Sequence, residues 1–307
     1  HQKIIKYVEK EITIFHAKVA NETIKKSKKS IDFIGFHGQT IFHNAKEKIT
    51  KQIGDGKLLS KLTKKKVVFN FRANDLKNGG EGAPLTPIFH DLIASKHKFV
   101  PPNIFVNIGG ITNFTFIDKS FSVGNIPIKN WYANDLCLGN CLIDQWIRKK
   151  TKKNFDKDGE IAKAGKVNKI RLKKGLQNYK VTNKNSLDIK DFNLSFVNGL
   201  SLKNGAATLT EYTAQILSNL LMFFAYKKIK IILCGGGRKN KFLIKKIKQK
   251  IPYKVLLIDD YGINGDFIES QAFAYLAVRS VLKLPISYPE TTGCKKPCTG
   301  GVIVKTF

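Results

Sequence analysis

Arginine, cysteine and long apolar runs are all scarce in this sequence. Only five of its 54 basic residues are Arg, the residue type that makes bidentate contacts with phosphate and guanine. No apolar run reaches the roughly 18 uncharged residues that span a bilayer, which argues against an integral membrane protein. The five cysteines form no dense framework, and such usage is typical of a reducing compartment. We therefore expect a cytoplasmic protein with no membrane partner.

The composition that remains is that of a globular protein large enough for a sizeable core. The chain has 307 residues, 42% of them apolar and 25% charged. These values exclude the disordered, collagen-like and coiled-coil classes. At about 150 residues per domain, the length predicts two domains.

The strongly positive charge raises nucleic acid as a partner, since the formal net charge is +31. The lysines are scattered, however, and they are not interleaved with the aromatic residues that stack on bases. Lys, Asn, Ile and Phe all have A/T-rich codons, so a genomic bias explains the excess at least as well. We expect no nucleic-acid partner.

Predicted strands and helices alternate along the chain. IDFIGF (31–36) and VVFNF (67–71) have the pattern of apolar strands, and the prolines of FVPPN (99–103) predict a linker. NIFVNI-GG-ITNFTFI (103–117) then predicts a β-hairpin around a Gly-Gly pair, and a long helix is expected over 208–226. The alternation predicts an α/β fold, and the hairpin excludes a purely parallel sheet.

Two glycine-rich turns are candidates for nucleotide contacts. The strand 229–234 runs into Gly235–Gly237, and Asn240 then opens a helix. Glycines between a strand and a helix N-terminus let backbone N–H groups approach a nucleotide closely. They also suit a plain tight turn, and no GxGxxG or GxxxxGKS pattern decides between the two. Asn107 and Gly109–Gly110 leave the same choice open, between a phosphate-facing backbone and a bare β-turn.

Polar residues at two strand ends are candidates for catalysis or binding. Asp135 ends the strand-like WYAND (131–135), where it could be a general base, a magnesium ligand or an ordinary turn or N-cap residue. His37, Gln39 and Thr40 follow a strand that should be central. Such residues either face the ligand crevice of an α/β sheet or satisfy turn hydrogen bonds.

The cysteines and histidines do not predict a metal site. Cys137 and Cys141, like Cys294 and Cys298, have a CxxxC spacing. Structural zinc sites more usually show CxxC pairs or His partners at defined distances. The histidines show no ligand spacing either, so no metal-ligating residue is expected.

Taken together, a series of stretches resembles the bacterial anhydro-N-acetylmuramic acid kinases. Each stretch is weak alone, but the set is specific because it runs in order through nearly the whole chain. The stretches are GFHGQTIFH (35–43), QIGD (52–55), VVFNFRANDLKNGGEGAPLTPIFH (67–90), NIGGITNFT (107–115), GNCLIDQWIR (139–148), KNSLDIKDFN (184–193), GAATLTEYTA (205–214), CGGGRKN (234–240), ESQAFAYLAVR (269–279) and TTGCKKPCTGG (291–301).

The resemblance implies an α/β fold of two RNase H-like lobes, of the actin, Hsp70 and hexokinase (sugar kinase) type, with mixed sheets flanked by helices. Residues 1–100 would form the first lobe, completed by 271–307. Residues 103–270 would form the second lobe, with a nucleotide-facing hairpin and glycine-rich turn. The family opens with a GTSxDG phosphate-binding hairpin that 1–30 does not match. The resemblance therefore implies an N-terminally truncated copy with an incomplete first lobe, inactive as a kinase.

The resemblance also implies an activity, with ATP and Mg²⁺ as cofactors. The family converts 1,6-anhydro-N-acetylmuramic acid, ATP and water to N-acetylmuramic acid 6-phosphate and ADP in peptidoglycan recycling. Asp135 matches the aspartate of the family's DTGPGN motif, which activates the water. Mg²⁺ and backbone donors would offset the phosphate charge. The implied nucleotide-binding residues are Asn107, Gly109, Gly110, Gly139, Asn140, Gly235, Gly236 and Gly237, and the implied substrate-binding residues are His37, Gln39, Thr40, Arg72, Asp75 and Glu269.

The match departs from the family beside the implied base. Leu136, Cys137 and Leu138 stand where the family has Thr, Gly and Pro, although Gly139 and Asn140 are kept. The altered loop favours an alternative function, a catalytically impaired sugar- or nucleotide-binding relative. The enzyme interpretation predicts ATP and a small sugar as partners, and a homodimer as an assembly.

Overall fold

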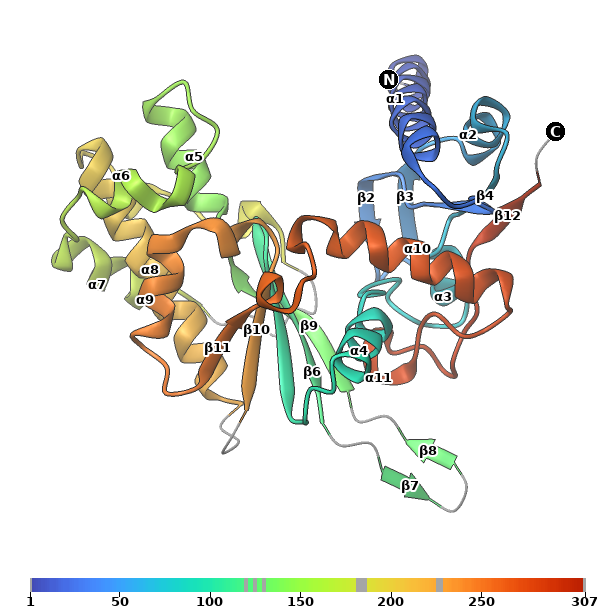
Figure 1. The fold of residues 1–307 in the computed structure, drawn as a ribbon. Coiled ribbons are helices and arrows are strands. Elements are labelled where there is room, and N and C mark those ends of the chain that lie inside the picture. Colours follow the sequence, from blue (N-terminus) through green and yellow to red (C-terminus); the bar gives the residue numbers. More distant parts are fainter. Residues whose placement is uncertain are drawn as a thin grey trace. The chain divides into compact units, whose positions relative to one another are not determined.

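The computed structural model describes most of the chain, in two compact units (Figure 1). Unit 1 comprises His1–Ile93 and Glu269–Phe307, and unit 2 comprises Ala94–Ile268. Residues 184–186 of one matching stretch and 225–226 of the expected long helix lie outside the described residues. The described residues are 2–118, 121–123, 126–128, 131–180, 187–224 and 229–305.

Unit 2 is built on a five-stranded mixed sheet with the order β11-β10-β5-β6-β9. Within this sheet, the three strands that come first in sequence are β5, β6 and β9, which form an antiparallel meander. β10 and β11 are added in parallel on the other side of β5. This is the strand order of an RNase H-like sheet. The predicted hairpin over 103–117 is confirmed as β5 and β6. The bounds are β5 Asn103–Ile108, β6 Ile111–Ile117, β9 Trp131–Leu138, β10 Lys230–Cys234 and β11 Lys254–Leu257.

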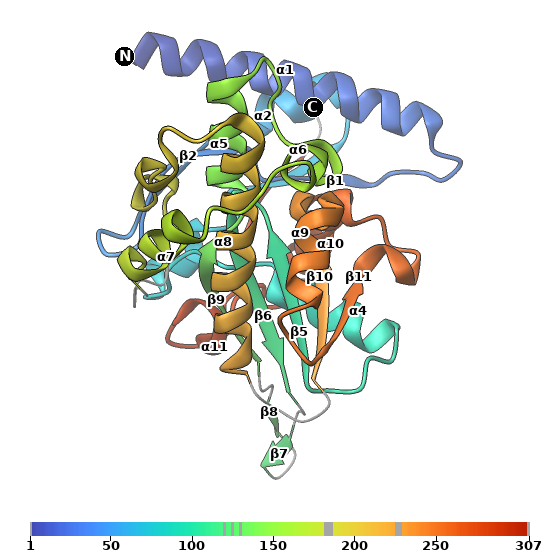
Figure 2. The same cartoon turned by 90° about the vertical axis from the view of Figure 1, so that its left-hand side faces the viewer.

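Helices cover the sheet of unit 2. Figure 2 shows α8 (Leu202–Met222) and α9 (Lys241–Lys248) side by side in front of its strands. The Asn240 side chain caps α9 by accepting from Leu243 N at 2.9 Å, as the sequence predicts for this position. Gly205 lets α8 approach α5, because a Cβ there would lie 2.3 Å from the Trp146 ring. The remaining helices are α5 Cys141–Lys150, α6 Glu160–Lys163 and α7 Lys169–Asn178, and a separate ribbon pairs β7 Phe121–Val123 with β8 Ile126–Ile128.

Unit 1 has a smaller three-stranded sheet with the order β1-β4-β12. β1 (Phe33–Phe36) runs parallel to β4 (Lys66–Phe69), and β12 (Val302–Val304) pairs with β4 in the antiparallel direction. A second ribbon pairs β2 (Gln39–Asn44) with β3 (Ile49–Ile53). Both sheets and their flanking helices confirm the predicted mixed α/β class.

The helices of unit 1 differ in how well they are covered. α2 starts at a cap in which Asp55 accepts from Lys57 N and Leu58 N at 2.8 and 3.0 Å. The long α1 buries only Thr13 and Ala17. None of the described helices is long and apolar enough to cross a membrane. The bounds are α1 Gln2–Lys26, α2 Gly56–Thr63, α3 Ala73–Lys77, α4 Pro87–Lys96 (which runs on into unit 2), α10 Ile268–Val281 and α11 Pro289–Thr292.

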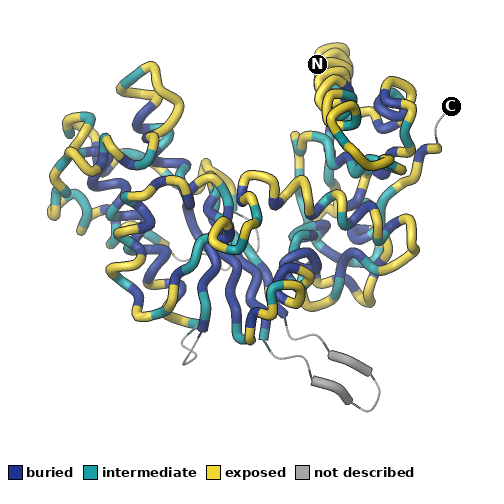
Figure 3. Tube along the Cα trace, viewed as in Figure 1, coloured by how far each residue is buried: buried dark blue, intermediate teal, exposed yellow. Residues whose placement is uncertain are grey.

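The two cores differ in extent. In unit 2 the strands and the inner faces of α5, α8 and α9 form one buried cluster, drawn dark blue in Figure 3. A smaller cluster in unit 1 joins Ala17, Phe36, Leu59 and Val67. Each core lies beside one group of the predicted functional residues.

Candidate functional site

Three turns of unit 2 meet at the carboxyl ends of its central strands. β10 is the parallel neighbour of β5 and pairs Cys234 with Asn107, so the turns that follow these strands lie side by side. The β9–α5 junction joins them through two backbone hydrogen bonds. Gly139 N donates to Gly110 O at 2.9 Å, and Asn140 N donates to Gly109 O at 2.8 Å. The structure therefore brings all the predicted nucleotide-binding segments together.

Some of these glycines are required by packing. A Cβ on Gly139 would lie 2.3 Å from Gly109 O, and one on Gly235 would lie 2.2 Å from Asn107 Oδ1. Gly235 also has a φ of +77°, which L side chains rarely adopt. A Cβ on Gly237 would meet Ile108 Cγ2 at 2.3 Å. Packing alone thus explains a tight turn at these three positions.

Two other glycines are not explained by packing. A Cβ on Gly236 would have no heavy atom within 4 Å, and one on Gly110 would meet only Ile189 Cδ1 at 3.6 Å. Neither position has a positive φ. Both glycines are exposed and leave space beside the backbone at the ends of neighbouring strands. Exposed backbone N–H groups in such a place are suited to bind anions.

Asn140 lies between these turns and is not used as a capping side chain. It takes the N-cap position of α5 without a side-chain capping bond. Its Nδ2 lies 2.9 Å from where a Cβ on Gly237 would be. The amide is thus directed at the β10–α9 turn.

Asp135 lies on β9, next to an irregularity in the ladder. The pairing with β6 shifts after Thr112, so Leu136 is left unpaired between Cys137 and Asp135. Such β-bulges re-aim side chains and are frequent beside active sites. The N-cap alternative for Asp135 is wrong, because the residue lies inside a strand and Asn140 takes the cap of α5.

The carboxylate of Asp135 has one hydrogen bond from a distant segment. Leu187 N donates to Asp135 Oδ2 at 2.9 Å. Burial raises the pKa of Asp135, and the bond from Leu187 opposes that rise. A carboxylate with a raised pKa is suited to accept a proton from water. Sequence reasoning missed Leu187, which is distant in the chain and acts through its backbone.

The predicted substrate residues lie in unit 1, where Arg72 and His37 form a pair. Arg72 Nε donates to His37 Nε2 at 3.0 Å, and His37 Nδ1 contacts Gly38 O at 2.8 Å. A neutral imidazole with its proton on Nδ1 satisfies both contacts. Burial, and then the charge of Arg72, lower the pKa of His37 to about 4, which is consistent with this tautomer. The His37 ring also packs against Phe273, with 4.3 Å between centroids.

Asp75 braces the loop beside this pair. Its Oδ2 accepts from Gly82 N at 2.6 Å and its Oδ1 accepts from the Thr292 hydroxyl at 2.7 Å. Gly82 O in turn accepts from Arg72 Nη1 at 2.8 Å. The Asp75 side chain is buried, with 1% of the residue exposed. Asp75 therefore holds Arg72 in place indirectly, because it binds the Gly82 loop that accepts a hydrogen bond from Arg72. No sequence pattern indicated its contact with Thr292.

The other predicted substrate residues, Glu269, Thr40 and Gln39, lie outside the hydrogen-bonded Arg72–His37 pair. Burial lowers the pKa of Arg72 to about 10. The negative charges of Glu269, at the start of α10, and of Asp75 partly oppose this decrease. Thr40 Oγ1 accepts from Gln52 Nε2 at 3.2 Å within the β2–β3 ribbon, and the exposed Gln39 contacts Thr40 O at 3.4 Å.

The described residues contain no group of three or more His, Cys, Asp or Glu side chains that could hold a metal ion. All five cysteines are free and buried.

An RNase H-like sheet with glycine turns at the ends of its central strands fits the class that the sequence predicts, the ATP-using sugar kinases. A family model described as anhydro-N-acetylmuramic acid kinase matches residues 2–306. The chain belongs to the anhydro-N-acetylmuramic acid kinase family, as its ordered motifs predict.

Two relatives with this name illustrate the extent of the match. The protein of Pelagibacter ubique (strain HTCC1062) is 49% identical over 312 residues, covering 99% of this chain and 82% of that protein. The protein of Zymomonas mobilis (strain ATCC 31821 / ZM4 / CP4) is 39% identical over 307 residues, covering 98% and 81%. One solved structure that matches is the activator of the 2-hydroxyisocaproyl-CoA dehydratase from Clostridium difficile, with bound ADPNP. The match has a TM-score of 0.35 and 12% sequence identity, and it covers 61% of this chain and 66% of that chain.

Proposed function

We propose that the protein converts 1,6-anhydro-N-acetylmuramic acid, ATP and water to N-acetylmuramic acid 6-phosphate and ADP, in the cytoplasmic recycling of peptidoglycan. The observation behind this proposal is the position of Asp135, at a β-bulge of β9 beside two glycine turns. Membership of the family supplies the substrate class.

In this proposal Asp135 is the general base. Water attacks the anomeric carbon, its proton passes to Asp135, and the bond from that carbon to O6 breaks. O6 then forms a bond to the γ-phosphorus as the bond to the β–γ bridging oxygen breaks, which releases ADP. The bond from Leu187 N holds one carboxylate oxygen, so that the other oxygen is oriented toward water.

The backbone of the two turns would hold the nucleotide. Gly110 and Gly236 leave space for phosphate oxygens, and backbone N–H groups there stabilise charge at no cost of reorganisation during transfer. Gly109, Gly235 and Gly237 shape these turns, and Asn107, Gly139 and Asn140 fix them to β5 and α5.

The Arg72–His37 pair of unit 1 would bind the sugar. Arg72 uses Nε and Nη1 within the unit, and we assign its Nη2 to the lactyl carboxylate, since a planar guanidinium suits a carboxylate. Gln39, Thr40 and Glu269 would contact sugar hydroxyls. Asp75 would act indirectly, by holding the Gly82 loop.

We propose that Mg²⁺ enters as the ATP complex. The described residues do not fit a dedicated metal cage, and Mg²⁺ is commonly held by phosphates and water with few protein ligands. Bound in this way, the ion would neutralise phosphate charge, and no residue of this chain is assigned to it. We also propose that the protein forms a homodimer, and the assignment of the activity does not depend on this assembly.

The test follows ADP release by the full-length gene product with anhydro-N-acetylmuramic acid, glucose and glycerol as acceptors. Release with the anhydrosugar alone is expected. Equal rates with all three acceptors, or no release with the anhydrosugar, would refute the assignment.

The altered loop supports a second candidate, a catalytically impaired binding relative. In the structure this stretch continues β9, with Cys137 and Leu138 both 0% exposed. Cys137 and Leu138 are thus part of the hydrophobic core of unit 2, and Leu136 packs against it. Tight binding of ATP and sugar without turnover would favour the binding relative over the kinase.

A further inference from the structure

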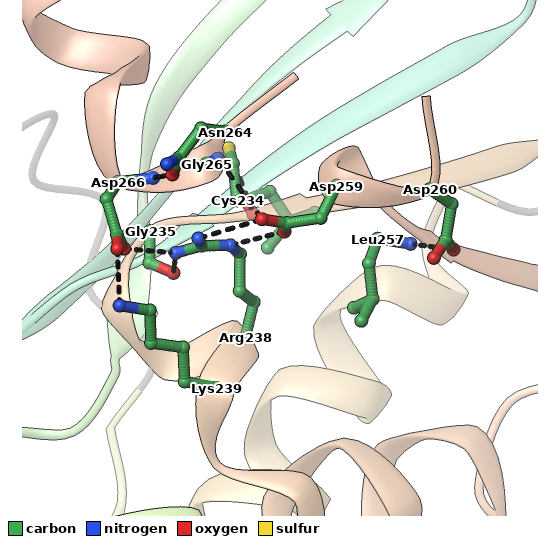
Figure 4. A network of polar contacts seen from close by, with 11 residues as sticks. Cys234, Gly235, Arg238, Lys239, Leu257, Asp259, Asp260, Asn264, Gly265 and Asp266 are labelled. Atoms are coloured by element: carbon green, nitrogen blue, oxygen red, sulfur yellow. Dashed lines mark hydrogen bonds and ion pairs between the residues drawn. The ribbon is translucent and has the colours of Figure 1, made fainter. Parts of the chain in front are cut away.

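A buried arginine joins the β10–α9 turn to the segment between β11 and α10 (Figure 4). The Arg238 side chain is only 3% exposed. Its Nε and Nη2 donate to the two carboxylate oxygens of Asp259 at 2.6 and 3.0 Å. Its Nη1 donates to Asp266 Oδ1 and to Gly235 O, both at 2.9 Å. One guanidinium thus connects the β10–α9 turn to two 3₁₀ turns of that segment, Ile258–Tyr261 and Gly265–Phe267.

The surroundings fit the planar group closely. A Cβ on Gly265 would lie 2.3 Å from Arg238 Nε, so the guanidinium lies directly against this backbone. Gly265 N also donates to Asp259 Oδ1 at 3.3 Å. The Asp259 and Asp266 side chains are 42% and 40% exposed. The two carboxylates therefore contact solvent, whereas the guanidinium is buried.

The chemistry of the network requires arginine. The bond to Asp259 raises the pKa of Arg238, and the same bond lowers the pKa of Asp259, so both groups stay charged. A bidentate pair with a third donor aimed at a carbonyl needs the fixed fork of a guanidinium, which a lysine ammonium cannot reproduce.

The carbonyl that Arg238 holds belongs to the first glycine of the turn. Gly235 O belongs to the same peptide unit as the N–H of Gly236, the glycine whose Cβ side is open. Fixing this carbonyl therefore fixes the plane of the peptide and the direction of that N–H. The same carbonyl also accepts from Arg238 N at 3.3 Å, so both the backbone and the side chain of Arg238 hold this peptide.

We propose that Arg238, held by Asp259 and Asp266, is a positioning residue that presents the Gly236 N–H to a nucleotide phosphate. This inference rests on the proposed function, in which the β10–α9 turn binds ATP. Arg238 is expected to govern nucleotide affinity and to leave sugar affinity unchanged, because the predicted sugar residues belong to unit 1.

The experiment measures ADP and sugar binding by calorimetry on the full chain, with hydrogen exchange of residues 235–240. Arg238→Lys should weaken ADP binding at least about tenfold, speed exchange of the turn and leave sugar affinity unchanged. Asp259→Asn, a milder change at a half-exposed residue, should weaken ADP binding several-fold. Arg148→Lys is the matched control and should bind ADP normally, since Arg148 is exposed and donates to Asn154 O at 3.2 Å, outside the β10–α9 turn.

Gly236→Val separates this inference from the proposed function, because its side chain would block the N–H without touching Arg238. If Gly236→Val abolishes ADP binding while Arg238→Lys and Asp259→Asn bind and exchange as the wild type does, the positioning role is wrong and the nucleotide site stands. If Gly236→Val binds ADP normally, both ideas are wrong. If Arg238→Lys does not fold, the result with Asp259→Asn decides.

Discussion

The two units hold their candidate residues in different ways. In unit 2 the central strand β5 is enclosed, with Ile104 and Val106 both 0% exposed, and the site consists mainly of backbone at strand ends. In unit 1 the sheet has three strands, and α1 leaves Tyr7 and Phe15 65% and 64% exposed. The candidate site of unit 1 consists of side chains that are hydrogen-bonded to one another, such as Arg72 and His37.

This difference determines which perturbations matter in each unit. A backbone site in a packed core is sensitive to added volume, because neighbours cannot move without strain. A site of paired side chains around Arg72 and His37 is sensitive to protonation, because one added charge breaks a donor–acceptor match. The predictions below test these two sensitivities.

The largest expected effect tests whether the chemistry belongs to unit 2. Asp135→Asn should lower kcat by about two to four powers of ten and leave the affinities for ATP and sugar nearly unchanged. Steady-state kinetics with calorimetry measures both. Asp144→Asn, on α5, is the control and should stay within a few-fold of the wild type. Normal turnover by Asp135→Asn would remove this residue from the mechanism.

A matched glycine pair tests the sensitivity to volume. Gly237→Ala places a Cβ 2.3 Å from Ile108 Cγ2 and should cost about 1–3 kcal/mol of unfolding free energy. Gly236→Ala meets no heavy atom within 4 Å, so it should leave stability unchanged and weaken ADP binding. Urea unfolding and calorimetry measure the two effects. Equal destabilisation by both variants would contradict the packing argument.

Between about pH 6.5 and pH 4, protonation of buried groups should affect the stability of the two units in opposite directions. Burial lowers the pKa of His37 and of His90, both in unit 1, to about 4 from a usual 6.5. The unfolded state then binds more protons, so unit 1 loses stability as the pH falls from about 6.5 to about 4. Burial raises the pKa of Asp144, in unit 2, to about 6. This carboxyl favours the folded state at low pH, and its contribution is lost as the pH rises through 6.

Both tryptophans of the chain, Trp131 and Trp146, are buried in unit 2, so their fluorescence reports that unit alone. At pH 4.5, circular dichroism should show an earlier transition that fluorescence does not follow, with unit 1 weakened by roughly 1–3 kcal/mol. His37→Gln should reduce this weakening. Coincident transitions at pH 4.5 and pH 7 would refute the contrast between the units.

The smallest expected effect concerns Leu187. Leu187→Pro removes the N–H that opposes the raised pKa of Asp135. The pKa of the base should rise further, which moves the acidic limb of the kcat profile to higher pH by about one unit. Leu187→Ala keeps the N–H and should leave the limb in place. A lower kcat with an unmoved limb would mean that the bond has only a structural role.

Local patterns predicted much of unit 2. The β5–β6 hairpin follows from strand alternation around a Gly-Gly pair, and the strand, turn and cap at 229–240 follow from an apolar run, three glycines and an asparagine. The polar composition of 166–205 does not predict regular structure, yet this stretch contains α7 and a 3₁₀ turn at Ile189–Asp191. α7 forms against α8 and Phe196, where Gly175 allows a contact that sequence periodicity does not record.

The α/β class, the family and the residue types of the candidate sites could all be read from the sequence, because they depend on short-range periodicity and on the order of motifs. Which of these residues meet could not be read from it. Asp75 reaches Thr292 across 217 positions, Leu187 reaches Asp135 across 52, and Arg238 reaches Asp266 across 28. The physical reason is that these contacts depend on the path of the chain between sheets and turns, whereas local preference acts only over a few neighbouring residues.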